Sequence, residues 1–233
     1  MSVVPAPAQR DARDARPSVD VPDIDPMEMG PWYCICRSVA RLAVVLLFDF
    51  KAYGLHNVPR RGGALLCANH QSYLDPVLFG AMIPRPVSFL AKSELFANRF
   101  FGWLIRSLHA FPVRQGKGDK AAIDETIRRL REGHLLNLYP EGSRTEDGEI
   151  ARIERGAALV VRRAGVPIVP AVVHGSFDAW PKGSKIFRPH PIRVLYGPVL
   201  KVEGLKSEQI VELIDRTLRK MLSDLRAGRV AGY

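Results

Sequence analysis

Residues 64–79 read ALLCANHQSYLDPVLF, and this segment decides how we expect the chain to fold. Its first part, Ala64 to Ala68, is a short apolar run after Gly62-Gly63, which is typical of a buried strand. Asp75-Pro76 is a helix-start signal, because aspartate can cap free backbone donors and proline is tolerated in the first turn. The pattern therefore predicts a strand, a tight turn and a helix, with His70 just beyond the strand.

The predicted turn brings His70 and Asp75 face to face. Five positions apart on one continuous helix, two side chains would diverge by about 140°, whereas across a turn they can meet. A neighbouring carboxylate fixes the tautomer of an imidazole, and the other ring nitrogen can then take a proton from an alcohol. The pair is therefore a candidate general base. The alternative is an ordinary loop histidine beside a helix-capping aspartate.

The rest of the chain alternates between predicted strands and helices. Strands are expected at residues 48–53, 87–91, 111–114, 135–138, 168–173 and 192–196. Helices are expected at residues 93–109, 119–131, 155–164 and 207–226, with an extended loop at 175–191. This alternation predicts an α/β domain with a mostly parallel sheet flanked by helices, in which active groups lie at the carboxyl ends of strands.

Three regions are expected along the chain. Residues 1–30 contain five prolines and little periodicity, which predicts a disordered leader. Residues 31–47 are predicted to form an amphipathic helix in a membrane interface, and ordinary packing on the domain is an equally weighted alternative. Its apolar residues near one side are Trp32, Tyr33, Ile35, Val39, Leu42 and Leu46, with Arg37 and Arg41 on another. Residues 48–233 are the expected catalytic domain.

Charge and cysteine content indicate which kinds of partner and which compartment suit the protein. The formal net charge is +10, and residues 1–30 contain three Arg and six Asp or Glu, which leaves +13 for the rest. A body this basic favours an anionic partner, such as lipid headgroups, a phosphorylated substrate, an acidic carrier protein or nucleic acid. Three cysteines give no disulfide framework, which fits a reducing compartment. We identify no secretory signal, and the apolar run 42–48 is far shorter than a membrane span of about 20 residues.

A second candidate site follows the strand predicted at 135–138. Residues 139–145 read YPEGSRT, so Glu141, Gly142, Ser143 and Arg144 emerge at the carboxyl end of a strand. An arginine can grip a phosphate through two hydrogen bonds, and Glu141 can accept from a hydroxyl or orient Arg144. These residues are candidate substrate contacts. The alternative is a polar turn with a surface ion pair.

Arg114 and Lys117 lie in a glycine-containing loop and are further candidate phosphate contacts, although such basic loops are most often solvated. No metal site is expected, because the six histidines lack H-E-x-x-H spacing. Nucleic acid is also not an expected partner, since no helix-turn-helix, zinc or RNP signature occurs. Lipid headgroups, phosphorylated substrates and an acidic carrier protein remain as candidate anionic partners.

Over residues 48–202 the chain resembles the lysophosphatidic acid (1-acylglycerol-3-phosphate) acyltransferase family. The resemblance is carried by NHQSYLD at 69–75, YPEGSR at 139–144 and VPIVP at 166–170, which match three of the family's four blocks. The remaining block, G-x-I/F-x-V-x-R, is represented by HAFPVRQ at 109–115. There the sequence departs from the family, because His109 stands in place of glycine and Gln115 in place of arginine.

The resemblance implies a glycerolipid acyltransferase-like fold with His70 as the catalytic base and Asp75 as its orienting partner. It also implies an acceptor and phosphate site at Glu141, Gly142 and Arg144. The reaction would transfer a fatty acyl group from acyl-CoA or acyl carrier protein to 1-acylglycerol-3-phosphate, giving phosphatidic acid. No cofactor beyond the thioester co-substrate is expected. We favour direct transfer over an acyl-Ser72 intermediate, because the chain has no G-x-S-x-G elbow.

The expected partners are a lysophospholipid acceptor, the acyl-CoA or acidic carrier protein, and an anionic membrane surface. The expected location is the cytoplasmic face of a membrane, as a peripheral protein. A second enzymatic interpretation keeps the fold and changes the acceptor to another lysolipid or a lyso-aminolipid. The non-enzymatic alternative is a basic protein that binds membranes or nucleic acid.

Overall fold

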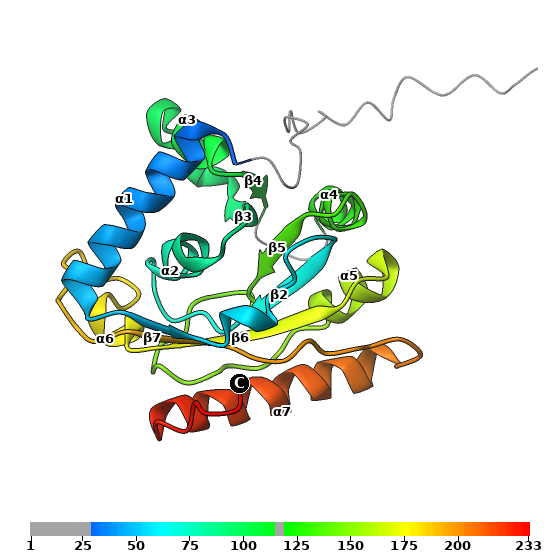
Figure 1. The fold of residues 1–233 in the computed structure, drawn as a ribbon. Helices are drawn as coiled ribbons and strands as arrows, with labels where there is room; N and C mark the ends of the chain where they lie inside the picture. Colours follow the sequence, from blue (N-terminus) through cyan, green and yellow to red (C-terminus); the bar gives the residue numbers. More distant parts are fainter. Residues whose placement is uncertain (1–28, 115–118) are drawn as a thin grey trace, which may run out of the picture.

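A computed structural model describes residues 29–114 and 119–233. The predicted leader at residues 1–30 lies almost entirely outside the described residues. Seven strands form one sheet in the order β1-β7-β6-β2-β5-β3-β4, with helices on both faces (Figure 1). The strands are β1 Lys51–Tyr53, β2 Ala64–Ala68, β3 Val87–Lys92, β4 Ala110–Val113, β5 Leu135–Leu138, β6 Ile168–His174 and β7 Arg193–Tyr196.

The helices match most of the predicted segments. They are α1 Pro31–Phe48, α2 Asp75–Met82, α3 Arg99–Ser107, α4 Lys120–Arg131, α5 Gly156–Ala164, α6 Ser176–Ala179 and α7 Ser207–Arg226, with 3-10 turns η2 Leu55–Asn57 and η3 Ser93–Phe96. All strand pairs are parallel except β6 with β7, where Ala171 lies opposite Tyr196. The predicted α/β fold with a mostly parallel sheet is confirmed.

Strand β2 lies near the centre of the sheet and is covered on both faces. All five of its residues are fully buried, which explains why the strand is a continuous apolar run without alternation. Helices α1 and α2 cover one face through side chains such as Phe48 and Phe79. Helices α4, α5 and α7 cover the other, with Leu130, Val160 and Leu218 among the packed residues. His70 therefore follows a central strand that is buried by helices on both faces of the sheet.

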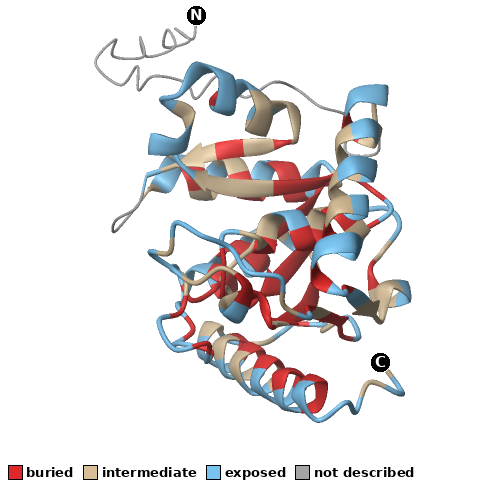
Figure 2. Ribbon diagram, turned by 90° about the vertical axis from the view of Figure 1, so that its left-hand side faces the viewer, coloured by how far each residue is buried: buried red, intermediate tan, exposed pale blue. Residues whose placement is uncertain are grey.

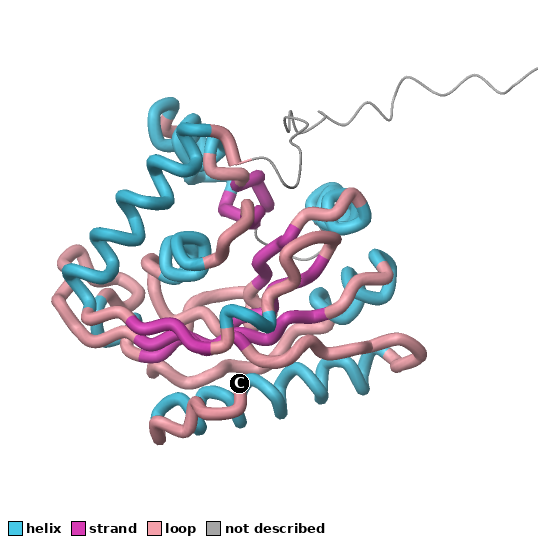
Figure 3. The backbone as a smooth tube through the Cα atoms, viewed as in Figure 1, coloured by secondary structure: helices cyan, strands magenta, loops and turns pink. Residues whose placement is uncertain are grey.

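Three segments differ from the sequence prediction. The strand expected at 48–53 is reduced to β1, because Phe48 is the last residue of α1 and Asp49 ends that helix with a φ of +38°. The single helix expected at 93–109 is divided into η3 and α3, because Asn98 begins a new helix and its side chain accepts a hydrogen bond from the Phe101 N–H at 2.9 Å. The loop expected at 175–191 contains the short helix α6, which begins after Gly175 with its backbone in the left-handed region. The long remainder of that loop is drawn in pink before β7 in Figure 3.

Helix α1 confirms the helix predicted at 31–47 and extends it by one residue. Its buried side chains are Tyr33, Val44 and Phe48. Tyr33 therefore faces the domain, whereas the sequence analysis grouped it with the apolar residues of the interfacial side. The outer side of α1 stays exposed (Figure 2). Its exposed apolar residues are Trp32, Ile35, Val39, Leu42, Val45, Leu46 and Leu47. Among the described residues, α1 alone is long and apolar enough to cross a membrane, as judged by length and composition only.

Candidate active site

His70 and Asp75 meet as the turn predicted. Nδ1 of His70 lies 2.8 Å from Oδ2 of Asp75, whose side chain is fully buried, while 17% of the histidine side chain is exposed. Within the described part of the chain, Nε2 of His70 has no hydrogen-bond partner. A carboxylate on Nδ1 orients the ring and stabilises a proton there, which leaves Nε2 as the acceptor. The geometry is that of an oriented imidazole whose side chain is partly exposed.

Asp75 does not cap helix α2, contrary to the sequence prediction. It is the first residue of that helix, Leu74 is the capping residue, and no side chain accepts from the first turn. The carboxylate instead turns back, and its Oδ2 accepts the N–H groups of Gln71 at 2.6 Å and Ser72 at 2.8 Å. Asp75 therefore fixes the backbone of the turn as well as the imidazole ring.

Ser176 completes the environment of Asp75, and sequence reasoning missed it. Its hydroxyl donates to Oδ1 of Asp75 at 2.7 Å, and the serine is fully buried. Ser176 follows β6, and β6 is a direct neighbour of β2, so the two strand ends deliver both residues to one place. The only signal in the sequence was a hydroxyl just beyond the carboxyl end of a predicted strand.

The loop after β5 holds the backbone of His70 on both sides. The His70 N–H donates to Oε1 of Glu141 at 2.7 Å, and the His70 carbonyl accepts from the Thr145 N–H at 2.8 Å. The Tyr139 ring stacks on the imidazole, with ring centroids 3.8 Å apart and planes 10° from parallel. The first and third sequence blocks thus form one constellation at the carboxyl edge of the sheet.

Glu141 is turned inward. Its second oxygen accepts the Ala151 N–H at 2.7 Å, so both carboxylate oxygens are occupied by backbone donors of the protein itself. Burial raises the pKa of Glu141, and the two N–H donors, with the nearby His70, oppose this rise. These contacts make Glu141 a brace for the His70 turn. Its predicted contact with substrate remains a prediction.

Arg144 stacks on Tyr73 and does not pair with Glu141. The guanidinium carbon lies 3.5 Å from the centroid of the Tyr73 ring, a cation–π arrangement. Its Nη1 is buried and has no hydrogen-bond partner among the described residues. Gly142 has a φ of +71°, which favours glycine there, and Ser143 is exposed. The loop therefore presents a guanidinium with unused donors next to the turn that carries His70.

Arg114 stands apart from this cluster. It follows β4 at the same edge of the sheet, three strand positions from β2, which corresponds to about 14 Å at the usual strand spacing. Its side chain is exposed, and its N–H donates to Asp119 at 2.7 Å. Lys117 and Gln115 lie outside the described residues. The phosphate contact predicted for Arg114 remains a prediction.

His109, where the sequence departs from the family block, has a φ of +67°. This left-handed backbone is the one that glycine adopts without strain, which explains the glycine of the family pattern. The ring is buried with its centroid 5.0 Å from that of Tyr33, and its Nδ1 has no partner among the described residues. Burial lowers the pKa of His109 to about 4, so the ring is neutral in the fold.

Ser72 is a poor candidate for a covalent nucleophile. Its side chain is buried, its hydroxyl donates to the Trp180 carbonyl at 2.7 Å, and the same oxygen accepts from the Leu74 N–H at 3.2 Å. No base contacts the Ser72 hydroxyl among the described residues, and activation of a serine requires one.

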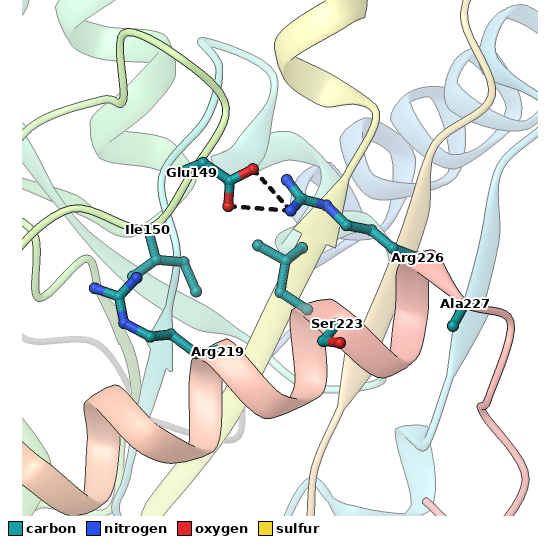
Figure 4. Close-up of a pocket in the computed structure, with 7 residues that line it drawn as sticks. Glu149, Ile150, Arg219, Ser223, Arg226 and Ala227 are labelled. Atoms are coloured by element: carbon teal, nitrogen blue, oxygen red, sulfur yellow. Dashed lines mark hydrogen bonds and ion pairs between the residues drawn. The ribbon is translucent and has the colours of Figure 1, made fainter.

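Helix α7 braces the loop that supports Glu141. Arg226 pairs with Glu149 at 2.8 Å, and Arg219 donates to the Ala151 carbonyl at 3.3 Å. A groove of about 540 Å³ lies between α7 and this loop (Figure 4). Its lining includes Glu149, Arg219, Ser223 and Arg226. The residues that line this groove do not include His70, so the groove is separate from the chemistry described above.

The comparisons with known proteins agree with this architecture. The model of the Acyltransferase family matches residues 49–174. A 1-acyl-sn-glycerol-3-phosphate acyltransferase of Bacillus subtilis (strain 168) is 27% identical over 72% of this chain and 82% of its own. A lyso-ornithine lipid O-acyltransferase of Pseudomonas aeruginosa is 30% identical over 75% of this chain and 64% of its own.

The fold has a close counterpart among solved structures. The crystal structure of the 1-acyl-sn-glycerophosphate acyltransferase PlsC from Thermotoga maritima superposes with a TM-score of 0.75, at 24% identity, over 84% of this chain and 80% of that one. The family match and the relatives identify the protein as an enzyme that transfers acyl groups. The chain belongs to the Acyltransferase family, whose model covers more than half of it.

Proposed function

We propose that the protein transfers a fatty acyl group from an acyl-CoA or acyl carrier protein thioester to the free hydroxyl of a lysolipid, with 1-acylglycerol-3-phosphate as the principal acceptor and phosphatidic acid as the product. The observation that carries this proposal is the His70–Asp75 pair, with Nδ1 held at 2.8 Å and Nε2 free. Arg144 adds an anion contact beside it.

In the proposed reaction Nε2 of His70 removes the proton of the acceptor hydroxyl as its oxygen attacks the thioester carbonyl. The tetrahedral intermediate then collapses, the carbon–sulfur bond breaks, and the imidazolium returns the proton to the leaving thiolate. General base catalysis of this kind contributes roughly 10²- to 10⁴-fold in rate. Direct transfer is supported by the Ser72 hydroxyl, which is buried and already bonded to the Trp180 carbonyl.

The phosphate of the acceptor is assigned to Arg144, because a guanidinium binds phosphate through paired hydrogen bonds and Nη1 has no other partner among the described residues. Arg114 is proposed as a more distant contact. A second acceptor class, other lysolipids or lyso-aminolipids, is favoured by the similarity to a lyso-ornithine lipid O-acyltransferase.

We further propose that the enzyme works as a peripheral protein on the cytoplasmic face of a membrane, with α1 lying in the interface. One side of α1 packs on the domain through Val44 and Phe48, and Arg37 donates to the Ile83 carbonyl at 2.8 Å. A helix held along the domain in this way is suited to lie in the membrane plane, with its exposed apolar side toward lipid. The three free cysteines fit a reducing compartment.

The test is release of free thiol from acyl-CoA, measured in detergent with a panel of lysolipids. Wild-type enzyme should use 1-acylglycerol-3-phosphate best, and His70→Ala should lose at least about 10²-fold in kcat while keeping its thermal stability, because the ring is partly exposed. Arg144→Ala should raise KM for phosphate-bearing acceptors selectively. A His70→Ala enzyme with wild-type turnover would contradict the mechanism, and a preference for an ornithine-based lysolipid would assign the second acceptor class.

A further inference from the structure

The segment between α6 and β7, residues 180–192, is called here the α6–β7 loop. Its tip exposes two large apolar side chains, Ile186 at 72% and Phe187 at 46%. Three exposed basic residues lie within four positions of them in the sequence, Lys182, Lys185 and Arg188. Single exposed apolar residues are common on protein surfaces and need no explanation. An exposed apolar pair in a basic segment favours a partner that is both apolar and anionic.

The loop is held in this shape by hydrogen bonds. The Trp180 indole N–H donates to the Ser184 carbonyl at 2.9 Å, and the Ser184 hydroxyl donates to the Ile186 carbonyl at 2.7 Å. The Arg188 N–H donates to the Ala179 carbonyl at 2.7 Å. Ile186 is therefore held in water by an ordered turn, although folding inward would bury its side chain.

The apolar tip lies against the carboxyl end of α1. The Phe187 ring lies 6.1 Å from that of Phe48, the last residue of α1, and the loop and this end of the helix lie side by side (Figure 1). Phe48 is buried and faces the domain, whereas Leu46, two residues earlier and about 200° around the helix, is 73% exposed. The loop tip therefore lies at the carboxyl end of α1, beside the end of its exposed apolar side and not along it.

A run of ring contacts leads from the loop to the active site. Phe187 lies 6.2 Å from Trp180, and Trp180 lies 5.4 Å from Tyr73, as measured between ring centroids. The guanidinium of Arg144 in turn stacks on the Tyr73 ring. A surface on which the loop rests would therefore lie near Tyr73 and Arg144, beside the turn that carries His70.

Charge indicates the nature of that surface. Lys182 pairs with Glu146 at 2.8 Å, whereas Lys185 and Arg188 have no ion pair within the described part of the chain. Two unpaired cations beside apolar side chains complement an anionic bilayer, where each basic residue near the surface raises binding about five-fold.

We propose that the α6–β7 loop is a second membrane-docking element, which inserts Ile186 and Phe187 among the headgroups of an anionic bilayer while Lys185 and Arg188 contact lipid phosphates. The inference rests on the proposed function, because it assumes that the acceptor is drawn from a membrane on which α1 lies. It adds that the enzyme docks at two places, so that the turn that carries His70, with Arg144 beside it, lies near the lipid surface.

The test measures partitioning of the full chain onto vesicles of phosphatidylcholine, alone or mixed with phosphatidylglycerol. Lys185→Ala/Arg188→Ala should weaken binding to the anionic vesicles about 25-fold, and Ile186→Ser about ten-fold. Matched controls are Arg60→Ala/Arg61→Ala, an exposed pair before β2 at the opposite edge of the sheet, and Leu159→Ser, which is 42% exposed on α5. The controls should change binding less than about two-fold.

The outcomes separate this inference from the proposed function. Loop variants that bind anionic vesicles like the wild type would overturn the docking role while leaving the transferase intact. A wild-type enzyme that fails to bind anionic vesicles, but releases thiol in detergent, would refute both the interfacial location and the loop. Loop variants that keep vesicle binding and instead raise KM for an acyl carrier protein would show that the loop docks a protein, and the membrane proposal would be wrong.

Discussion

Replacement of Ser176 by alanine tests whether the active site depends on a residue outside the sequence blocks. Ser176 is the only donor to Oδ1 of Asp75 among the described residues, at 2.7 Å, and both side chains are fully buried. The change leaves a carboxylate oxygen buried without a partner. The three remaining donors, from His70, Gln71 and Ser72, all contact Oδ2. The carboxylate then loses the contact that fixes its rotation.

The expected loss of stability and activity in Ser176→Ala depends on the negative charge of the Asp75 carboxylate, which accepts the hydrogen bond. A hydrogen bond to a charged group contributes about 1.5–3 kcal/mol. In a domain of this size that loss corresponds to a fall in Tm of about 3–12 °C. If the same energy were lost entirely from the transition state, kcat would fall about 10- to 150-fold. We expect about ten-fold, because three donors still hold Oδ2 and the imidazole keeps part of its orientation.

The assay combines steady-state thiol release with thermal unfolding. Ser176→Ala should lower kcat while KM for both substrates stays within about two-fold, and Ser176→Thr should recover most of the activity because it keeps the hydroxyl. Thr126→Ala is the control, since this buried hydroxyl donates to the Ala122 carbonyl at 2.7 Å on α4, away from the site. It should lower Tm without changing kcat. A Ser176→Ala enzyme with wild-type kcat, or with a change in KM alone, would refute the positioning role.

Two further predictions concern the neighbours of the site. Tyr73→Ala removes the aromatic ring on which Arg144 stacks. A cation–π contact contributes about 1–2 kcal/mol, so KM for a phosphate-bearing acceptor should rise roughly 5- to 30-fold. Tyr73→Phe keeps the ring and should change KM little. A Tyr73→Ala enzyme with unchanged acceptor KM would count against Arg144 as the phosphate contact. Burial lowers the pKa of His109 to about 4, so the unfolded state binds the proton of this residue more tightly than the folded state does. The free energy of unfolding should therefore fall as the pH drops from about 6.5 towards 4, by up to about 3 kcal/mol. His109→Gly should reduce this acid sensitivity in unfolding measurements and relieve the left-handed backbone, and an unchanged pH profile would contradict the assignment.

Local sequence signals predicted most of the fold and the centre of the site. An apolar run, a pair of glycines and Asp75-Pro76 were enough to locate β2, the turn and α2, because each signal acts within a few residues. The same signals predicted the contact of Asp75 with His70, but they also assigned its carboxylate to helix capping, which was wrong. The carboxylate faces backward because the N–H groups of Gln71 and Ser72 lie in its reach.

The rest of the site depends on strand order, which a single sequence does not contain. Ser176 reaches Asp75 only because β6 pairs with β2, and Glu141 reaches His70 only because β5 pairs with β2 on the other side. The stack of Arg144 on Tyr73 has the same origin. These contacts join segments about 70 to 100 positions apart, and local propensity carries no information over that distance.

The hydrogen bonds that hold the backbone of His70 have a consequence for the order in which the site forms during synthesis. The backbone of His70 is fixed on both sides only after the loop that follows β5 has folded against it, and Oδ1 of Asp75 has its donor only after Ser176 arrives. A chain emerging during synthesis therefore contains His70 long before it contains all the contacts that hold it. If His70 is the base that we propose, acyl transfer can begin only once residues 135–176 have folded against β2.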